Sequence, residues 1–386
     1  MIKLDGYSDK FKEIYFSKYW KKIEKNVLKN QTNFCEYFDE SCQNKKVKKE
    51  FFKEILTNPI NELIEKYECV KEYHNLAFLI SLDMTEMLKK MNVRKTTVRK
   101  DIRKEYLELC GAGELHTRLG KWTLQYVSVN KIKQDDICCS NEAWERYRSH
   151  MKKQYESEYG FLDEVFDYEL IDRETKWNIV DELDVSVCPY CNRQYINNII
   201  EQGAKRATAD IDHFYYKAVF YLWKMSLYNF VPSCKICNSL FKLQTNMDIP
   251  YPYLEEYSNS AVFDIKGGKE LIDLKDLFAW DDNGEIYLKY DGEIDKINKI
   301  KREADLFQIE ALYGIHKGFA NQLRYKKRVL GPQMIAWTIE SILDTNVTKN
   351  IDKTNLIKMI LYGIDVENID CKKQPLGKLM KDILRE

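Results

Sequence analysis

The stretch VCPYCN at residues 187–192 decides the fold, together with its counterpart SCKICN at residues 233–238. Each stretch carries two cysteines separated by two residues, and the four are Cys188, Cys191, Cys234 and Cys237. A gap of two residues lets both thiolates turn toward one ion, and two such pairs complete the tetrahedral sulfur set of a structural Zn²⁺ site. The spacing therefore predicts a four-cysteine zinc site. Four buried thiols without a metal would not need two matched spacings.

Between the two pairs lies an insert, because Cys234 follows Cys191 by 43 residues, more than the roughly 15–20 of a simple zinc ribbon. The insert holds Asp210, Asp212, His213 and Asn229, and Asn238 directly follows the last cysteine. Carboxylate and amide oxygens are hard ligands that suit Mg²⁺ or Mn²⁺, and an imidazole can take a proton from water near neutral pH. The insert thus carries the residue types of a second, catalytic metal site.

Each of these residues also has a simpler interpretation. An isolated Asp-His pair is more often a surface ion pair or a helix cap, and Asn229 alone is typical of a turn. In a strand Asp210 and Asp212 share a face, whereas His213 points the other way unless the strand ends there. Asp210 could orient the histidine, add a metal ligand, or lie at the surface. The order of the residues between two cysteine pairs is what favours chemistry.

The rest of the chain favours helices. It has 386 residues, with 44% hydrophobic and 32% charged side chains but only 15 glycines and 7 prolines. Apolar residues at helical spacing between 11 and 27 predict an amphipathic helix, and Asn58-Pro59 opens another. The segment 121–129 favours a strand or a buried connector. Short β-like runs flank EQGAK at 201–205, a helix is expected after Pro232, and Asp282-Asn283-Gly284 indicates a further hairpin turn.

We therefore expect a mainly α (α+β) chain in three regions. Residues 1–180 form a helical N-terminal region that binds a partner or nucleic acid, residues 185–250 form the metal core, and residues 251–386 add a small hairpin and more helices. The start of the chain lacks the apolar segment of a signal peptide, and its apolar windows are too short to span a membrane. We expect a cytoplasmic protein with reduced thiols, whose other cysteines are small buried side chains. These are Cys35, Cys42, Cys69, Cys110, Cys138, Cys139 and Cys371.

The segment Cys188–Lys242, with CPYC, DIDHF, YNFVPSCKICN and a following lysine, resembles the HNH endonuclease motif in its zinc-containing ββα-metal form. The resemblance implies that His213 is the general base, that Asp212 and Asn238 hold a catalytic Mg²⁺ or Mn²⁺ ion, and that Asn229 fixes the geometry between the two strands. It also implies phosphate contacts from Lys217 and Lys242. Two departures stand out. Tyr216 replaces a proline common in relatives, and Lys242 sits one place late.

A helical chain around such a core, ending in QPLGKLMKDILRE, is similar to the nuclease subunits of bacterial anti-phage systems of the Septu type. That resemblance implies antiviral defence and an ABC-type ATPase as protein partner, and HNH domains often work as oligomers.

Positive and negative side chains cancel, 61 against 61, so electrostatic attraction to nucleic acid has to be local. Eight of the residues from Lys89 to Lys104 are basic, and Lys95, Arg99 and Arg103 share a helical face. They are candidate phosphate contacts, and the alternative is a solvated helix surface.

The expected function is metal-dependent hydrolysis of DNA phosphodiesters, with His213 taking a proton from the attacking water. For this, Nδ1 of His213 would donate to an acceptor and leave Nε2 facing the water. Two alternatives remain open: an inactive zinc-binding scaffold module, and an RNA-cleaving toxin nuclease.

Overall fold

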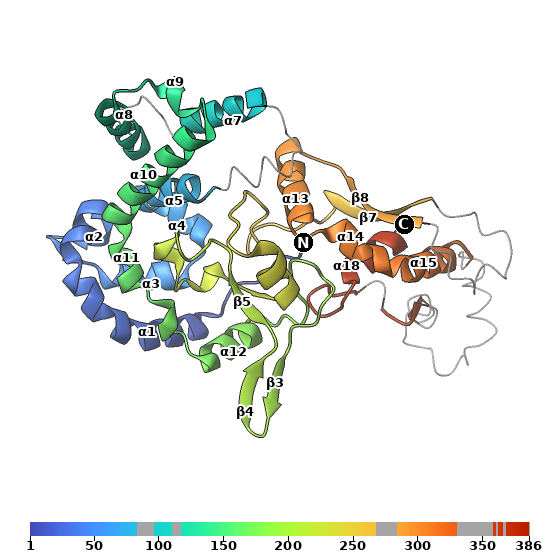
Figure 1. Ribbon diagram of the computed structural model, residues 1–386. Coiled ribbons are helices and arrows are strands. Elements are labelled where there is room, and N and C mark those ends of the chain that lie inside the picture. Colours follow the sequence, from blue (N-terminus) through green and yellow to red (C-terminus); the bar gives the residue numbers. More distant parts are fainter. Residues whose placement is uncertain are drawn as a thin grey trace.

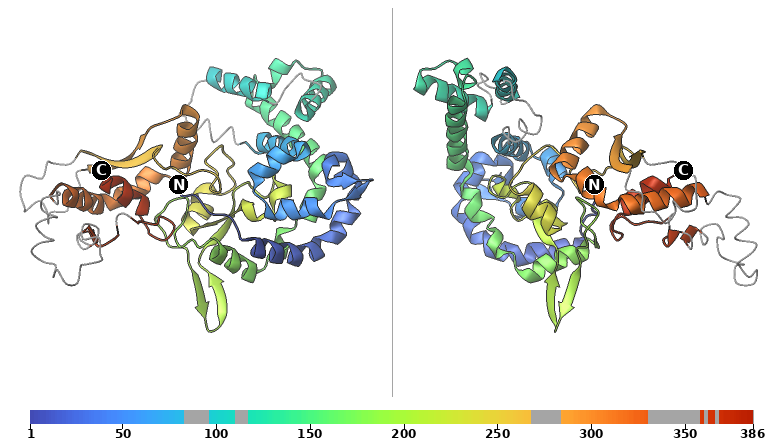
Figure 2. Two further views of the ribbon diagram at one scale, coloured as in Figure 1. Left: turned by 180° about the vertical axis from the view of Figure 1, so that it is seen from behind. Right: turned by 45° about the vertical axis from the view of Figure 1, so that its right-hand side comes forward.

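The computed structural model describes residues 1–82, 96–109, 117–267 and 284–329, and all residues from 358 to 385 except 360, 361, 366 and 367. Its described elements are mostly helical, with four small sheets of two strands each, consistent with a mainly α chain. Figures 1 and 2 show the N-terminal helices on one side, the C-terminal helices on the other, and the segment that carries strand β5 between them.

The N-terminal helices are α1 (Asp9–Lys29), α2 (Gln31–Tyr37), α3 (Lys49–Thr57), α4 (Ile60–Lys66), α5 (Glu68–Ser81), α7 (Thr96–Leu109), α8 (Arg118–Asn130), α9 (Gln134–Ile137), α10 (Asn141–Tyr159), α11 (Phe161–Val165) and α12 (Arg173–Glu182). The C-terminal helices are α13 (Ile294–Leu306), α14 (Ile309–Tyr313), α15 (Lys317–Val329) and α18 (Gly377–Leu384). Short 3₁₀ turns are η1 (Asp39–Ser41), η2 (Tyr168–Leu170), η3 (Tyr221–Trp223), η4 (Leu227–Asn229) and η7 (Gly314–His316), and η5 (Ile236–Lys242) is a π-helix.

The first predicted helix is confirmed as α1. Ser8 caps it, since its side chain accepts a hydrogen bond from the backbone N–H of Phe11. Tyr19, Ile23 and Val27 recur every four residues and are fully buried, so one face of α1 packs into the core. Helix α4 begins directly after Pro59, as the sequence predicts.

The prediction of a strand or connector at residues 121–129 is wrong, because this segment lies within helix α8. Its buried residues Trp122, Thr123 and Tyr126 fall on one helical face. The Thr123 hydroxyl shares a hydrogen bond of 2.8 Å with the Tyr147 hydroxyl of α10, and the rings of Tyr126 and Tyr147 pack edge to face. Tertiary packing therefore outweighs the β-propensity of this stretch.

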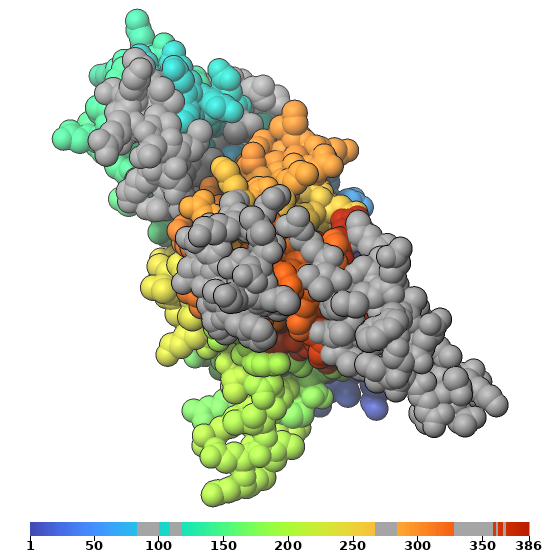
Figure 3. All heavy atoms as spheres, turned by 90° about the vertical axis from the view of Figure 1, so that its right-hand side faces the viewer, coloured from blue at the N-terminus to red at the C-terminus, as the bar shows by residue number. Residues whose placement is uncertain are grey.

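All four sheets are antiparallel pairs: β1 (Cys42–Gln43) with β2 (Lys46–Val47), β3 (Asn198–Glu201) with β4 (Ala204–Ala207), β5 (Asp210–His213) with β6 (Phe230–Ser233), and β7 (Ala261–Gly267) with β8 (Gly284–Tyr290). The predicted hairpin around EQGAK is the pair β3–β4, which extends away from the body (Figures 1 and 3). Gln202 and Gly203 turn it with φ angles of 51° and 82°, as a two-residue hairpin turn requires. Asp282 and Asn283, in the second predicted turn, lie outside the described residues.

One cluster of buried hydrophobic side chains runs through all three expected regions, from Leu4 through Trp223 to Met380. The segment between residues 185 and 250 is therefore packed on both sides by the helical regions. Of the part of the chain that the structure describes, no helix combines the length and the apolar character needed to cross a membrane.

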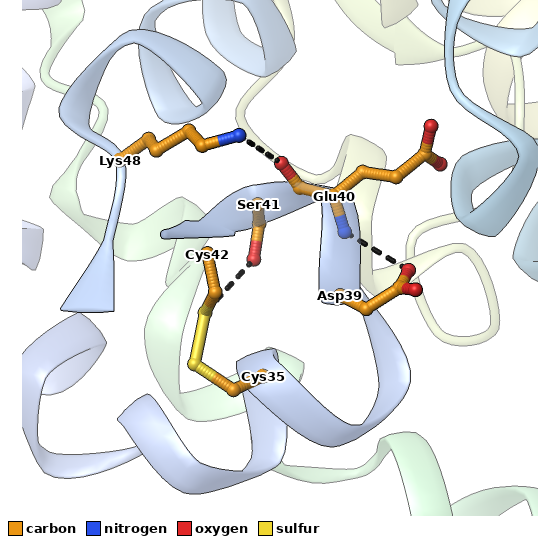
Figure 4. The surroundings of a disulfide bond; sticks show 6 residues. All are labelled: Cys35, Asp39, Glu40, Ser41, Cys42 and Lys48. Atoms are coloured by element: carbon orange, nitrogen blue, oxygen red, sulfur yellow. Dashed lines mark hydrogen bonds between the residues drawn. A yellow bond between two sulfur atoms is a disulfide. The ribbon is translucent and has the colours of Figure 1, made fainter. Parts of the chain in front are cut away.

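The expectation that the remaining cysteines are reduced, buried side chains needs correction. Cys35 at the end of α2 and Cys42 at the start of β1 form a disulfide with a Cα–Cα distance of 5.5 Å (Figure 4). The chain reverses through η1 between them, where the Lys48 ammonium donates to the backbone carbonyl of Glu40. Of the others, Cys69 and Cys138 are buried, Cys371 is half-buried, Cys139 is exposed, and Cys110 lies outside the described residues.

Candidate metal centre and active site

The four predicted zinc ligands meet in one place. Cys188, Cys191, Cys234 and Cys237 are buried, and their sulfur atoms all lie within 4.8 Å of one another. The sulfurs of Cys191 and Cys234 are 3.9 Å apart, close to the ~3.8 Å edge of a tetrahedron with Zn–S bonds of about 2.3 Å. Hydrogen bonds within the cluster, those with Cys188 first, lower the pKa of Cys234 and raise the pKa of Cys237. The cluster could therefore hold a metal ion such as zinc.

The first cysteine pair is anchored by Asn192, which the sequence reasoning missed. Asn192 is fully buried and has a φ of 50°, a left-handed conformation that asparagine tolerates. Its amide nitrogen donates to the carbonyls of Cys371 and Gln374, and its side-chain oxygen accepts from the backbone N–H of Lys378. The C-terminal segment that includes α18 is thus tied to the cysteine cluster. An asparagine directly after C-x2-C was the available signal.

The candidate active site is built on the ribbon β5–β6 and the π-helix η5. In the ribbon Asp210 pairs with Ser233 and His213 pairs with Phe230. Cys234 directly follows β6 and Cys237 lies in the first turn of η5, so the cysteine cluster joins the ribbon to the start of the helix.

The late position of Lys242 has a structural counterpart. A π-helix carries i→i+5 hydrogen bonds, and here the backbone N–H of Leu243 donates to the carbonyl of Asn238 at 3.0 Å. The wider turn accommodates one additional residue between Asn238 and Lys242. Both side chains consequently face β5: Asn238 bonds to Asp210 and Lys242 bonds to Asp212.

Asp212 lies at the centre of a buried polar network. It is 4% exposed, its Oδ2 accepts from the Tyr190 hydroxyl at 2.6 Å, and the Lys242 ammonium lies 3.0 Å away. The same ammonium donates to the carbonyl of His213 at 2.7 Å. Lys242 is 2% exposed, so this structure places it inside the network and not at a surface that could contact phosphate. Tyr190, whose ring stacks on Phe307, is a second residue missed from the sequence.

Asp210, on the same strand face, has a different environment. It is only partly buried, and its Oδ2 accepts from the Asn238 side-chain amide at 3.2 Å and from the Ser239 hydroxyl at 3.4 Å. The structure therefore joins Asn238 to Asp210, whereas the family resemblance implied that Asn238 and Asp212 share an ion. A carboxylate and an amide oxygen fit a hard divalent cation, which completes its coordination with water and substrate oxygens.

His213 ends β5 and is 9% exposed. Burial lowers its pKa to about 3, so the ring is neutral at physiological pH. Nε2 lies 3.1 Å from the backbone carbonyl of Lys224, and because a carbonyl only accepts, Nε2 carries the proton. The expected tautomer is thus reversed, and Nδ1 is the nitrogen that can accept a proton. Edge-to-face packing on Tyr168 and Phe230 holds the ring.

Asn229 is fully buried and closes the loop between β5 and β6. Its side-chain oxygen accepts from the backbone N–H of Tyr215 at 2.7 Å, and its amide nitrogen donates to the carbonyls of Tyr215 and Trp223, both at 3.0 Å. These three bonds hold the start, the middle and the end of the loop together.

Tyrosines from outside the motif hold the same loop. Five backbone carbonyls of the loop and the start of β6 accept hydrogen bonds from buried phenols: Val219 from Tyr155, Met225 from Tyr15, Leu227 from Tyr7, Tyr228 from Tyr251 and Phe230 from Tyr253. Burial raises the pKa of each phenol well above its usual value, so all five remain donors. A buried loop needs such partners for its backbone.

The predicted nucleic-acid contacts have mixed outcomes. Lys217 is partly exposed and lies over the ring of Tyr168, 4.6 Å from its centroid, which places it near His213. Arg103 is 7% exposed, donates to the carbonyl of Cys138 and to Asn141, and lies over Trp144. It therefore joins α7 to α10 and does not face solvent. Lys95 and the side chain of Arg99 lie outside the described residues.

Tyr216, which stands where relatives have proline, is partly exposed and lines a cavity of about 1020 Å³. The cavity lies between the end of α5, helix α10 and the end of η5, and Lys152, Leu240 and Gln244 also line it.

A comparison with family models, curated proteins and solved structures found no match to this chain.

Proposed function

We propose that the protein is a metal-dependent endonuclease of the HNH type that hydrolyses phosphodiester bonds of DNA. The observation that carries the proposal is the neutral imidazole of His213, held at the end of β5 with Nε2 on the Lys224 carbonyl. The four-cysteine cluster and the Asn229 bonds support this ribbon from both ends.

In this mechanism Nδ1 of His213 accepts a proton from the attacking water, and the Lys224 carbonyl stabilises the ring while it is protonated. Lys217, beside the Tyr168 ring, offers an ammonium to a phosphate oxygen. Zinc bound by the four cysteines would keep η5 and the ribbon in register. A Mg²⁺ or Mn²⁺ ion, when bound, would neutralise charge on the scissile phosphate and the leaving oxygen. The residues that would hold it are Asn238 and a carboxylate of β5.

The test is cleavage of supercoiled plasmid DNA by the full-length protein with Mg²⁺ or Mn²⁺. The wild-type protein should convert supercoiled DNA to nicked or linear forms, and His213→Ala should lose the activity. His150→Ala is the matched control because it removes an imidazole of α10 that packs on Tyr126 of α8. Cleavage at the wild-type rate by His213→Ala would refute the proposal.

One observation favours a second function, a zinc-binding scaffold module without catalysis. The Lys242 ammonium forms an ion pair with Asp212, whose carboxylate the motif assigns to the metal. That module would bind DNA or protein without cleaving nucleic acid in the presence of any divalent ion.

Parallel digests of labelled RNA and DNA distinguish a third candidate, an RNA-cleaving toxin nuclease, from the DNA endonuclease. A role in anti-phage defence together with an ABC-type ATPase belongs to the same proposal, and copurification with the ATPase would test it.

A further inference from the structure

The two carboxylates of β5 have opposite environments although they share a face. The Asp212 carboxylate is enclosed, since Tyr190 donates to it at 2.6 Å and the Lys242 ammonium lies 3.0 Å from it. The contacts of Asp210 are weaker, one with the Asn238 amide at 3.2 Å and one with the Ser239 hydroxyl at 3.4 Å. A carboxylate with weakly held oxygens is the easier one for a cation to bind.

A cation on Asp212 would have to displace a buried ammonium. Lys242 is 2% exposed, and among the described residues its ammonium donates to Asp212 and to the carbonyl of His213. Removing the carboxylate from this ammonium would leave a charge buried without its counter-ion, which is strongly unfavourable. Asp212 is therefore suited to joining η5, β5 and the first cysteine pair through Lys242 and Tyr190.

A third oxygen lies beside Asp210. Ser233 is directly opposite Asp210 in the ribbon, and directly opposed residues of an antiparallel pair lie on the same face. Ser233 is fully buried, and its hydroxyl has no hydrogen-bond partner among the described residues. Buried polar groups normally have partners, so this hydroxyl is available as an oxygen ligand on the side of Asp210.

Asn238 can supply the remaining ligand. Its amide nitrogen now donates to Asp210, and a half-turn of the amide would bring its oxygen to the same side. A carboxylate, an amide oxygen and a hydroxyl, together with water, form the mostly aqueous oxygen set that Mg²⁺ and Mn²⁺ accept.

We propose that Asp210, together with Asn238 and Ser233, holds the catalytic divalent cation, and that Asp212 is a positioning residue that binds Lys242 and Tyr190. This inference rests on the proposed function, because it names which β5 carboxylate serves the metal. It replaces the motif-based expectation that Asp212 is the ligand.

The test compares the isosteric variants Asp210→Asn and Asp212→Asn in the full-length, zinc-loaded protein. Mn²⁺ affinity is measured by electron paramagnetic resonance, and stability by thermal unfolding. Asp210→Asn should weaken Mn²⁺ binding by about tenfold or more and leave the melting temperature nearly unchanged. Asp212→Asn should lower the melting temperature and, well below it, keep Mn²⁺ binding within about threefold of the wild type. The opposite pattern would overturn the assignment.

Lys242→Met provides a second route if Asp212→Asn does not fold. The substitution frees the Asp212 carboxylate of its ammonium. If Asp210 is the ligand, Mn²⁺ affinity stays unchanged, and if Asp212 is the ligand, affinity rises. Plasmid cleavage by the wild type distinguishes a failure of the ligand assignment from a failure of the proposed function. A wild type that cleaves while Asp210→Asn still binds Mn²⁺ refutes only the ligand assignment, whereas a wild type that neither binds Mn²⁺ nor cleaves refutes the proposed function as well.

Discussion

Acidification should weaken the folded state through His74 of α5, a histidine outside the motif. Its side chain is 9% exposed, and Nδ1 accepts a hydrogen bond from the Trp223 indole at 3.2 Å. The rings of Tyr215 and Phe220 lie 4.8 and 5.5 Å from its own. His74 therefore holds the loop between β5 and β6 against the N-terminal helices.

The magnitude follows from its pKa, which burial lowers from 6.5 to about 4. The unfolded chain binds the proton near pH 6.5 and the folded protein only near pH 4, so the unfolded state binds more protons in between. The stabilisation is complete above pH 6.5 and is lost as the pH falls toward 4. At about 1.4 kcal/mol for each pKa unit, the full loss is about 3 kcal/mol, of which about 2 kcal/mol is lost by pH 5.

The assay is urea unfolding at pH 7.5 and pH 5, followed by tryptophan fluorescence, for the wild type and His74→Gln. Glutamine keeps an acceptor for Trp223 but does not titrate. The other histidines are common to both proteins and cancel in the comparison. Between the two pH values the wild type should lose about 2 kcal/mol more than the variant. Parallel pH dependences would show that burial of His74 does not oppose its protonation, and the reasoning would fail.

Two further predictions concern the supports of the candidate site, and a third concerns the N-terminal region. Asn229→Ala should lower the free energy of unfolding by about 2 kcal/mol or more, because the Tyr215 N–H and carbonyl lose their partner, whereas the Trp223 carbonyl keeps the Ser226 N–H; Ser226→Ala, which removes a buried hydroxyl without a partner among the described residues, is the control. Cys234→Ser should abolish stoichiometric zinc, measured by metal analysis, and unfold the core, and a full zinc content would disprove the ligand set. Reducing the disulfide between Cys35 and Cys42 should cost about 2 kcal/mol, whereas the double serine variant should not respond to reductant.

The sequence predicted those parts of the site that depend on local spacing. Two matched C-x2-C pairs predict that four sulfur atoms lie close together, and in the structure they do. Asn229 was identifiable because the motif places it just before the second pair. The residues that carry long-range contacts were not identifiable. Tyr155 and Tyr15 donate hydrogen bonds to backbone carbonyls of the 214–230 segment, from helices that are distant in the sequence. No local pattern distinguishes these two residues among the 26 tyrosines of the chain.

The predictions for charged residues were wrong for a related reason. A basic helical face predicts phosphate contacts only if the face is exposed, and the burial of Arg103 against Trp144 and Asn141 depends on how α7 packs on α10. Lys242 was one residue late for the motif, which weakened its assignment from the sequence. The structure resolves this displacement through the π-helix, whose wider turn directs Lys242 to Asp212.

The displacement of Lys242 connects the sequence to the assignment of the metal ligand. The residue that completes the widened turn is a lysine, and its ammonium lies on the carboxylate that the motif would give to the ion. If the ion is kept within η5 and β5, its carboxylate must then come from the position two residues earlier, where Asp210 meets Asn238 and the hydroxyl of Ser233 has no partner among the described residues. A one-residue change in the helix thus predicts a two-residue shift of the ligand along the strand, because alternate strand residues share a face.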